Sequence, residues 1–153
     1  MNAIQDESSA ASTRSVAEMM DFSVRLTDEQ ADSLYRYAHS QASQGRYAPA
    51  RALISLLRLH RPSEPVYAQA LGVCFRNLGL YEEAAIQFSQ AYDMQPEDLE
   101  LVLQTIDCLQ RMGRHEQSLG LLRTLVEVAH GRGRTDIAER AEALIEFMEA
   151  PRQ

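Results

Sequence analysis

The feature that most constrains this chain is a spacing of 34 residues that recurs at many positions. Gly45, Gly79 and Gly113 are each 34 residues apart. Each glycine is followed by an aromatic residue or histidine two positions on, a small residue five on and a large apolar residue nine on. These are Tyr47, Tyr81 and His115, then Ala50, Ala84 and Ser118, then Ile54, Phe88 and Leu122. A fixed period of this length predicts a stack of similar units, each packed on its neighbours.

The residue types within one period predict a pair of helices joined by a tight turn. A glycine can end the first helix in a left-handed backbone conformation that other residues adopt at a cost. Small residues such as Ala38 and Gly72 suit positions where two helices cross closely, and Pro62 and Pro96 follow the second helices. Apolar residues recur with a helical period and never with a strand period. The predicted helices cover about 28–44, 47–60, 64–78, 81–94, 98–112 and 115–129.

The ends of the chain add two further helices to this prediction. A short helix is expected over about 13–22, and Thr27 with Gln30 forms a capping box for the next one. The segment Gly131–Gly133 is expected to break the chain as a hinge. A last helix over about 135–150 would cap the stack with one apolar face, made of Ile137, Ala141, Leu144, Ile145 and Met148. The predicted division is an arm over 1–26, repeats over 31–64, 65–98 and 99–132, and a capping helix over 134–150, with the repeat domain spanning 27–150.

Charge and composition argue against several kinds of partner. The chain has a formal charge of −7 and no lysine, so phosphate backbones and anionic membrane surfaces would repel it. We expect no nucleic-acid partner and no membrane partner. The first residues lack the basic and apolar regions of a signal peptide, and no apolar run is long enough to span a membrane. We therefore expect a cytoplasmic protein.

The sequence contains none of the motifs that would indicate catalysis. A phosphate-binding loop, a dinucleotide fingerprint, a zinc-ligand spacing and a nucleophile elbow are all missing. Glu82 and Glu83 are adjacent on a predicted helix and would point apart. Cys74 and Cys108 occupy the same repeat position, which favours helix packing over reactivity. We predict no enzymatic activity, no catalytic residue, no metal site and no cofactor.

A binding groove is expected on the concave face, which the first helix of each pair lines in such a stack. In the repeat frame the groove-facing residues are Tyr35, His39, Ala42, Val66, Gln69, Val73, Arg76, Leu103 and Asp107, with Gln110 as the third-repeat counterpart of Ala42 and Arg76. Tyr35, Val66, Val73 and Leu103 would make this groove partly apolar, and exposed apolar patches often mark interaction sites. The alternative is that the N-terminal arm covers Tyr35 and Val73.

The 34-residue pattern resembles the tetratricopeptide repeat over about 31–132. The middle repeat matches best, through Leu71, Gly72, Phe75, Gly79, Tyr81, Ala84, Phe88, Ala91 and Pro96. This resemblance implies an all-α fold in which three helix–turn–helix repeats form a short right-handed superhelix. Members that clamp a terminal carboxylate use Lys and Asn where this chain has Tyr35 and His39, so an extended apolar segment is the expected ligand.

A narrower resemblance covers about 27–148. The runs Leu34–Ala38 and Gly45–Tyr47 with Ala50, and Leu71–Arg76 and Leu78–Tyr81 with Ala84, are similar to the first two repeats of the class II chaperones of bacterial type III secretion. That family implies a cytoplasmic bacterial chaperone that holds an extended N-terminal segment of hydrophobic, pore-forming translocator proteins in its groove. It keeps them soluble, apart and competent for secretion. The family alone suggests a homodimer formed through the arm.

Two other functions fit the same sequence. A tetratricopeptide scaffold or assembly protein would use the repeats for docking without chaperone activity. A chaperone of needle subunits would hold a helical partner in place of an extended one. Both alternatives also lack catalysis.

Overall fold

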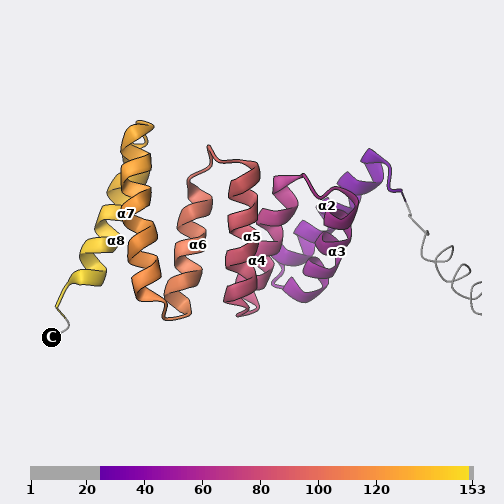
Figure 1. Ribbon diagram of the computed structural model, residues 1–153. Helices are drawn as coiled ribbons and strands as arrows, with labels where there is room; N and C mark the ends of the chain where they lie inside the picture. Colours follow the sequence, from indigo (N-terminus) through magenta and orange to yellow (C-terminus); the bar gives the residue numbers. More distant parts are fainter. Residues whose placement is uncertain (1–24, 152–153) are drawn as a thin grey trace, which may run out of the picture.

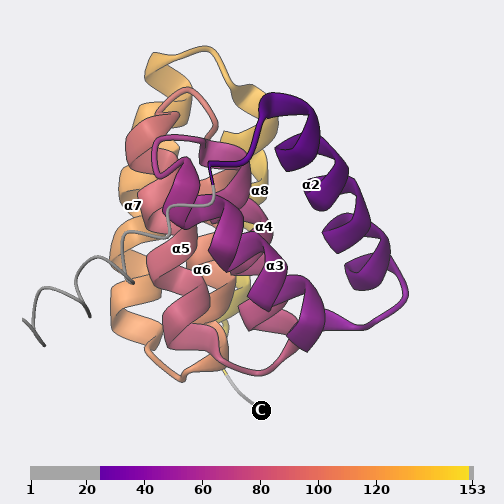
Figure 2. The same ribbon diagram turned by 90° about the vertical axis from the view of Figure 1, so that its right-hand side faces the viewer.

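The computed structural model describes residues 25–151, which form seven α-helices and no strand in that range. Three antiparallel hairpins stand side by side, and a last helix closes the row (Figure 1). Figure 2 looks along this row from the first hairpin. The hairpins are tetratricopeptide repeats. Their helices are α2 (Asp28–Ser43) and α3 (Tyr47–His60), α4 (Pro65–Asn77) and α5 (Tyr81–Met94), and α6 (Glu100–Arg111) and α7 (His115–Gly131), followed by α8 (Thr135–Glu149). The helix predicted over 13–22 lies outside the described residues.

The turns inside the three repeats are built as the glycine spacing predicts. Gly45, Gly79 and Gly113 have φ angles of 76°, 76° and 72°, in the left-handed region that favours glycine. In the middle repeat the amide of Leu80 donates to the carbonyl of Phe75 at 2.9 Å, which satisfies a carbonyl at the end of α4. At the start of the stack, Thr27 and Gln30 make both hydrogen bonds of the predicted capping box.

The core lies between the helices, with small residues where they approach most closely. Ala38, Ala50 and Ala84 are fully buried. Gly72 lies under the ring of Phe88, where an added Cβ would come within 2.6 Å of a ring carbon. These contacts confirm the predicted close crossings.

The chain breaks after Gly131 as predicted, and it does so at a hairpin turn between α7 and α8. Gly133 has a φ of 68°, and the amide of Arg134 donates to the carbonyl of Ala129 at 2.8 Å. This is the geometry of the three repeat turns, and α7 consequently extends to Gly131, beyond the predicted end at about 129. Ala138, five residues after Gly133, is fully buried. The turn folds α8 tightly against α7.

Helix α8 packs through the face predicted from its sequence. Ile137 and Ala141 are buried with Leu122, Leu125 and Ala129 of α7. Leu144, Ile145 and Met148 pack partly buried against the same cluster. The opposite face of α8 is rich in glutamates and exposed. Within residues 25–151, no helix combines the length and the apolar character needed to cross a membrane.

Candidate peptide-binding groove

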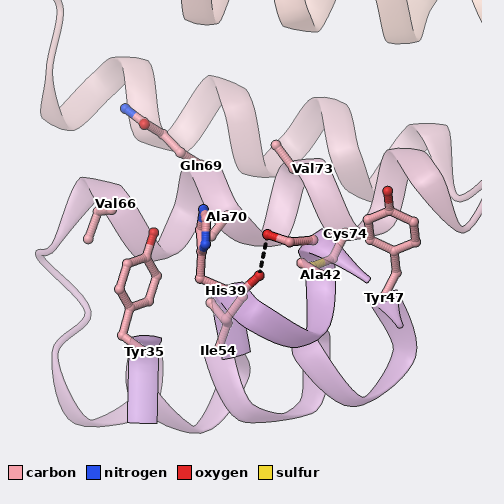
Figure 3. Close-up of a pocket in the computed structure, with 11 residues that line it drawn as sticks. Tyr35, His39, Ala42, Tyr47, Ile54, Val66, Gln69, Ala70, Val73 and Cys74 are labelled. Atoms are coloured by element: carbon pink, nitrogen blue, oxygen red, sulfur yellow. Dashed lines mark hydrogen bonds between the residues drawn. The ribbon is translucent and has the colours of Figure 1, made fainter. Parts of the chain in front are cut away.

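A cavity of about 340 Å³ opens between α2 and α4 in the first two repeats. Tyr35, His39 and Ala42 of α2 face Val66, Gln69 and Val73 of α4 across it (Figure 3). Six of the nine residues predicted for the groove therefore line one cavity. Its size lies at the lower end of the range for sites that bind small ligands or side chains.

Two contacts position the α2 side of this cavity, one between α2 and α4 and one within α2. The ring of Tyr35 packs at a tilt on that of Tyr67, with 5.5 Å between centroids. The hydroxyl of Ser43 donates to the carbonyl of His39 at 2.9 Å (Figure 3). Burial raises the pKa of Tyr35, and the nearby Tyr67 and Cys74 raise it further. Tyr35 therefore stays neutral and offers an apolar ring with a polar tip to a ligand.

Five residues of this cavity were not predicted from the repeat frame. Ser43 and Ala70 lie on its walls, and Tyr47 enters from α3. Ile54 and Cys74 are almost fully buried and form its floor. Short side chains at some groove-facing positions leave these deeper residues accessible to a ligand. The position of a residue in the repeat does not give the depth of the cavity, so the repeat pattern could not predict this.

The chemistry of the first cavity is that of a site for neutral apolar groups. Its lining includes Val66, Val73, Ile54 and two tyrosines, but no aspartate, glutamate or arginine. Val66 is 37% exposed in the unliganded protein. Covering this surface with an apolar side chain would remove it from water without burying an unpaired charge.

The remaining predicted residues line a second cavity of about 500 Å³, between α4, α6 and α8. Arg76, Leu103, Asp107 and Gln110 all belong to it. The Arg76 side chain reaches from α4 to α6, where it donates to Gln104 and lies 3.9 Å from a carboxylate oxygen of Asp107. The predicted groove residues thus form two cavities of different chemistry.

The prediction that Leu103 contributes exposed apolar surface to the groove is wrong. Only 7% of it is exposed, because it packs into the cluster that joins α6, α7 and α8. Packing α8 onto the last repeat covers the side chain that repeat register alone leaves open. In the second half of the groove, Leu103 therefore contributes little free apolar surface.

The two cysteines are buried and paired with no other thiol. Burial raises the pKa of both, that of Cys108 to about 11. Protonated thiols are poor nucleophiles and poor metal ligands. Across the part of the chain that the structure describes, no cluster of His, Cys, Asp and Glu is suited to a metal ion.

Sequence comparisons give no relative for this chain. Protein-family models do not match it, and no curated protein is similar enough in sequence to count as one.

Comparison of the folds gives a consistent set of neighbours. The complex of PcrH, a protein of Pseudomonas aeruginosa, with the chaperone binding region of PopD superimposes with a TM-score of 0.72 at 22% identity, covering 83% of this chain and 97% of PcrH. The type III secretion chaperone SycD of Yersinia enterocolitica, in complex with a peptide of the translocator YopD, gives 0.69 at 19%, covering 80% and 95%.

The fold is somewhat less similar to that of a tetratricopeptide domain which is not described as a type III secretion protein. The Sgt2 domain of Aspergillus fumigatus gives a TM-score of 0.62 at 19% identity, covering 86% of this chain and 91% of that domain. At these identities the likeness establishes the fold, and the chain is a three-repeat tetratricopeptide domain with a closing helix.

Proposed function

We propose that this protein is a chaperone of type III secretion that binds translocator proteins through an extended segment held in the groove. The observation that carries the proposal is the uncharged apolar cavity between α2 and α4. Support comes from the fold shared with PcrH and SycD, whose complexes contain a segment of PopD and a peptide of YopD. In this proposal the protein acts in the bacterial cytoplasm, is not an enzyme, and forms a homodimer through the arm over 1–26.

The expected affinity follows from the area that an extended segment can bury. Two or three apolar anchors would each contribute roughly 1.5–3 kcal/mol on burial. Ordering the segment opposes part of this gain, so we expect dissociation constants on the order of micromolar. Such binding is tight enough to shield an apolar segment and weak enough to release it for export.

The test compares two substitutions that place the same charge on different faces. Val66→Glu puts a carboxylate on the wall of the first cavity, where an apolar anchor would have to desolvate it. Ile86→Glu is the matched control, because Ile86 is 50% exposed on α5 and lies outside both cavities. Each variant would be co-expressed with candidate partners that carry long apolar segments and are encoded near its gene, and the soluble partner measured after pull-down.

The proposal requires that Val66→Glu lose the partner while Ile86→Glu retains it. Equal retention by both variants, each folded by circular dichroism, would remove the cavity from consideration as the binding site. A partner that is soluble without this chain, yet binds it, would favour a docking scaffold over a chaperone.

A further inference from the structure

The second cavity has a charge pattern opposite to that of the protein as a whole. The chain carries a formal charge of −7. Yet among the residues that the structure describes, Asp107 is the one carboxylate lining either cavity, whereas Arg76, Arg111 and Arg140 all line the second. The lining of the second cavity therefore holds three arginines and one carboxylate, an excess of positive charge in a protein that is negative overall.

The three arginines come from three helices, and two of them converge on one carboxylate. Arg76 of α4 and Arg111 of α6 lie 3.9 Å and 3.0 Å from the same oxygen of Asp107. Arg140 of α8 pairs with Glu100, which stands outside the cavity lining. Two guanidinium groups share Asp107, so neither is fully neutralised by it.

Of the three arginines, Arg76 is the one partly shielded from water, whereas the side chains of Arg111 and Arg140 are 52% and 55% exposed. The side chains of Arg76 and Asp107 are 27% and 38% exposed, respectively. Arg76 is held in place by its hydrogen bond to Gln104 and by the ring of Phe88, which its guanidinium overlies at 5.7 Å from the centroid. Charges that are partly desolvated and already oriented bind an opposite charge more strongly than free surface groups do.

We propose that the second cavity binds an acidic side chain, aspartate or glutamate, of the same extended segment whose apolar residues enter the first cavity. This inference rests on the proposed function and adds its specificity: the segment carries a carboxylate a short distance from its apolar anchors. Neighbouring packed helices are about 8–10 Å apart and an extended chain advances about 3.3 Å per residue, so the carboxylate lies about three residues from an anchor. Basic residues at that place would meet the arginines and be rejected.

The experiment begins by selecting ligands without assuming the partner. A phage-displayed library of random short peptides, joined to the phage through their C-termini, is selected on the purified full-length protein. The display leaves no free C-terminal carboxylate, so any acidic preference comes from side chains. We expect apolar anchors with Asp or Glu enriched about three residues away, and Lys and Arg depleted there.

The selected peptide is then titrated by calorimetry, amidated at its C-terminus, in a Glu form and a Gln form. Changing Glu to Gln should weaken binding to the wild-type protein about fivefold, as for a partly exposed charged contact. Arg140→Gln should reduce that difference, since Arg76 and Arg111 remain, and Asp107→Asn should increase it, because it frees Arg76 and Arg111. Arg123→Gln is the matched control, since Arg123 pairs with Glu149 on α8 and lines neither cavity; it should leave both affinities unchanged.

The experiment distinguishes failure of this inference from failure of the proposed function. Selected peptides with apolar anchors but no acidic preference, or equal losses of the Glu and Gln forms in Arg140→Gln, would overturn this inference and leave the proposed function standing. Peptides without apolar anchors, or peptides that bind Val66→Glu as tightly as wild type, would overturn the proposed function together with it.

Discussion

Replacing Gly72 with alanine should destabilise the protein, although the same change usually stabilises a helix. Gly72 lies within α4, and a Cβ there would come 2.6 Å from Cε1 of Phe88 and 2.8 Å from Cδ1 and Cζ. The Phe88 ring cannot easily move away, because it is fully buried and the Arg76 guanidinium covers it. The added methyl group therefore has to displace packed core.

The size of the effect follows from two opposing terms. Alanine in place of glycine inside a helix contributes roughly 0.5–1 kcal/mol of stability. Overpacking a core by one methyl group costs about 1–3 kcal/mol. The net expectation for Gly72→Ala is a loss of about 1–2 kcal/mol in the free energy of unfolding.

Gly120 provides the matched control, because it is also inside a helix but has nothing within 4 Å of the position that an added methyl group would take. Gly120→Ala should therefore stabilise by up to about 1 kcal/mol. Urea unfolding followed by far-ultraviolet circular dichroism measures both changes. In a Phe88→Leu background the cost of Gly72→Ala should largely disappear. If Gly72→Ala stabilises as much as Gly120→Ala does, the close helix crossing assigned to α4 and α5 is wrong.

Three further predictions test the turns, the cap and the core. Gly79→Ala should lower the free energy of unfolding in urea by about 1 kcal/mol, because Gly79 has a φ of 76°, which strains any other residue. Gly131→Ala is the control and should cause no such loss, since Gly131 has an ordinary φ and open space around it. Equal losses in the two variants would refute the backbone strain assigned to position 79. Thr27→Ala should cost about 1 kcal/mol through loss of the capping box, and an unchanged thermal midpoint would mean that the box contributes nothing. The pKa of Cys108 is raised from 9.0 to about 11, so the unfolded chain releases this proton first and stability falls as pH rises from 9 to 11. Cys108→Ala should lack this part of the fall, about 2 kcal/mol over that interval; parallel pH profiles of variant and wild type would argue against a buried, protonated thiol.

The physical reason for glycine differs between two positions of the middle repeat. Gly79 stands at the turn between α4 and α5, and nothing lies within 4 Å of the place where its Cβ would stand. Its positive φ is what requires glycine. Gly72 is the reverse case, with an ordinary φ and a crowded surrounding. Both occur at fixed places in the repeat, but for different physical reasons.

The sequence predicted which residues face the groove, but not that they line two separate cavities. Repeat register places all nine expected residues on the lining of one cavity or the other. Register cannot show that Arg76 spans the gap between α4 and α6, because the reach of a long side chain depends on the partners that the next helix presents. The cavity floor at Ile54 and Cys74 was missed for a similar reason, since it depends on how short the residues above it are.

The sequence alone determined the hairpins, because each turn and each close crossing depends on local residue types that recur every 34 residues. It also contained a signal for the fourth turn that the 34-residue frame hid: Ala138 follows Gly133 by five residues, as Ala50 follows Gly45. The sequence predicted that α8 caps the stack, but only the tertiary structure decided how α8 packs beside α6, and hence that Leu103 is buried and Arg140 joins the groove. Contacts between helices of different repeats depend on the angle and depth of packing, and these are properties of the whole stack and not of one period.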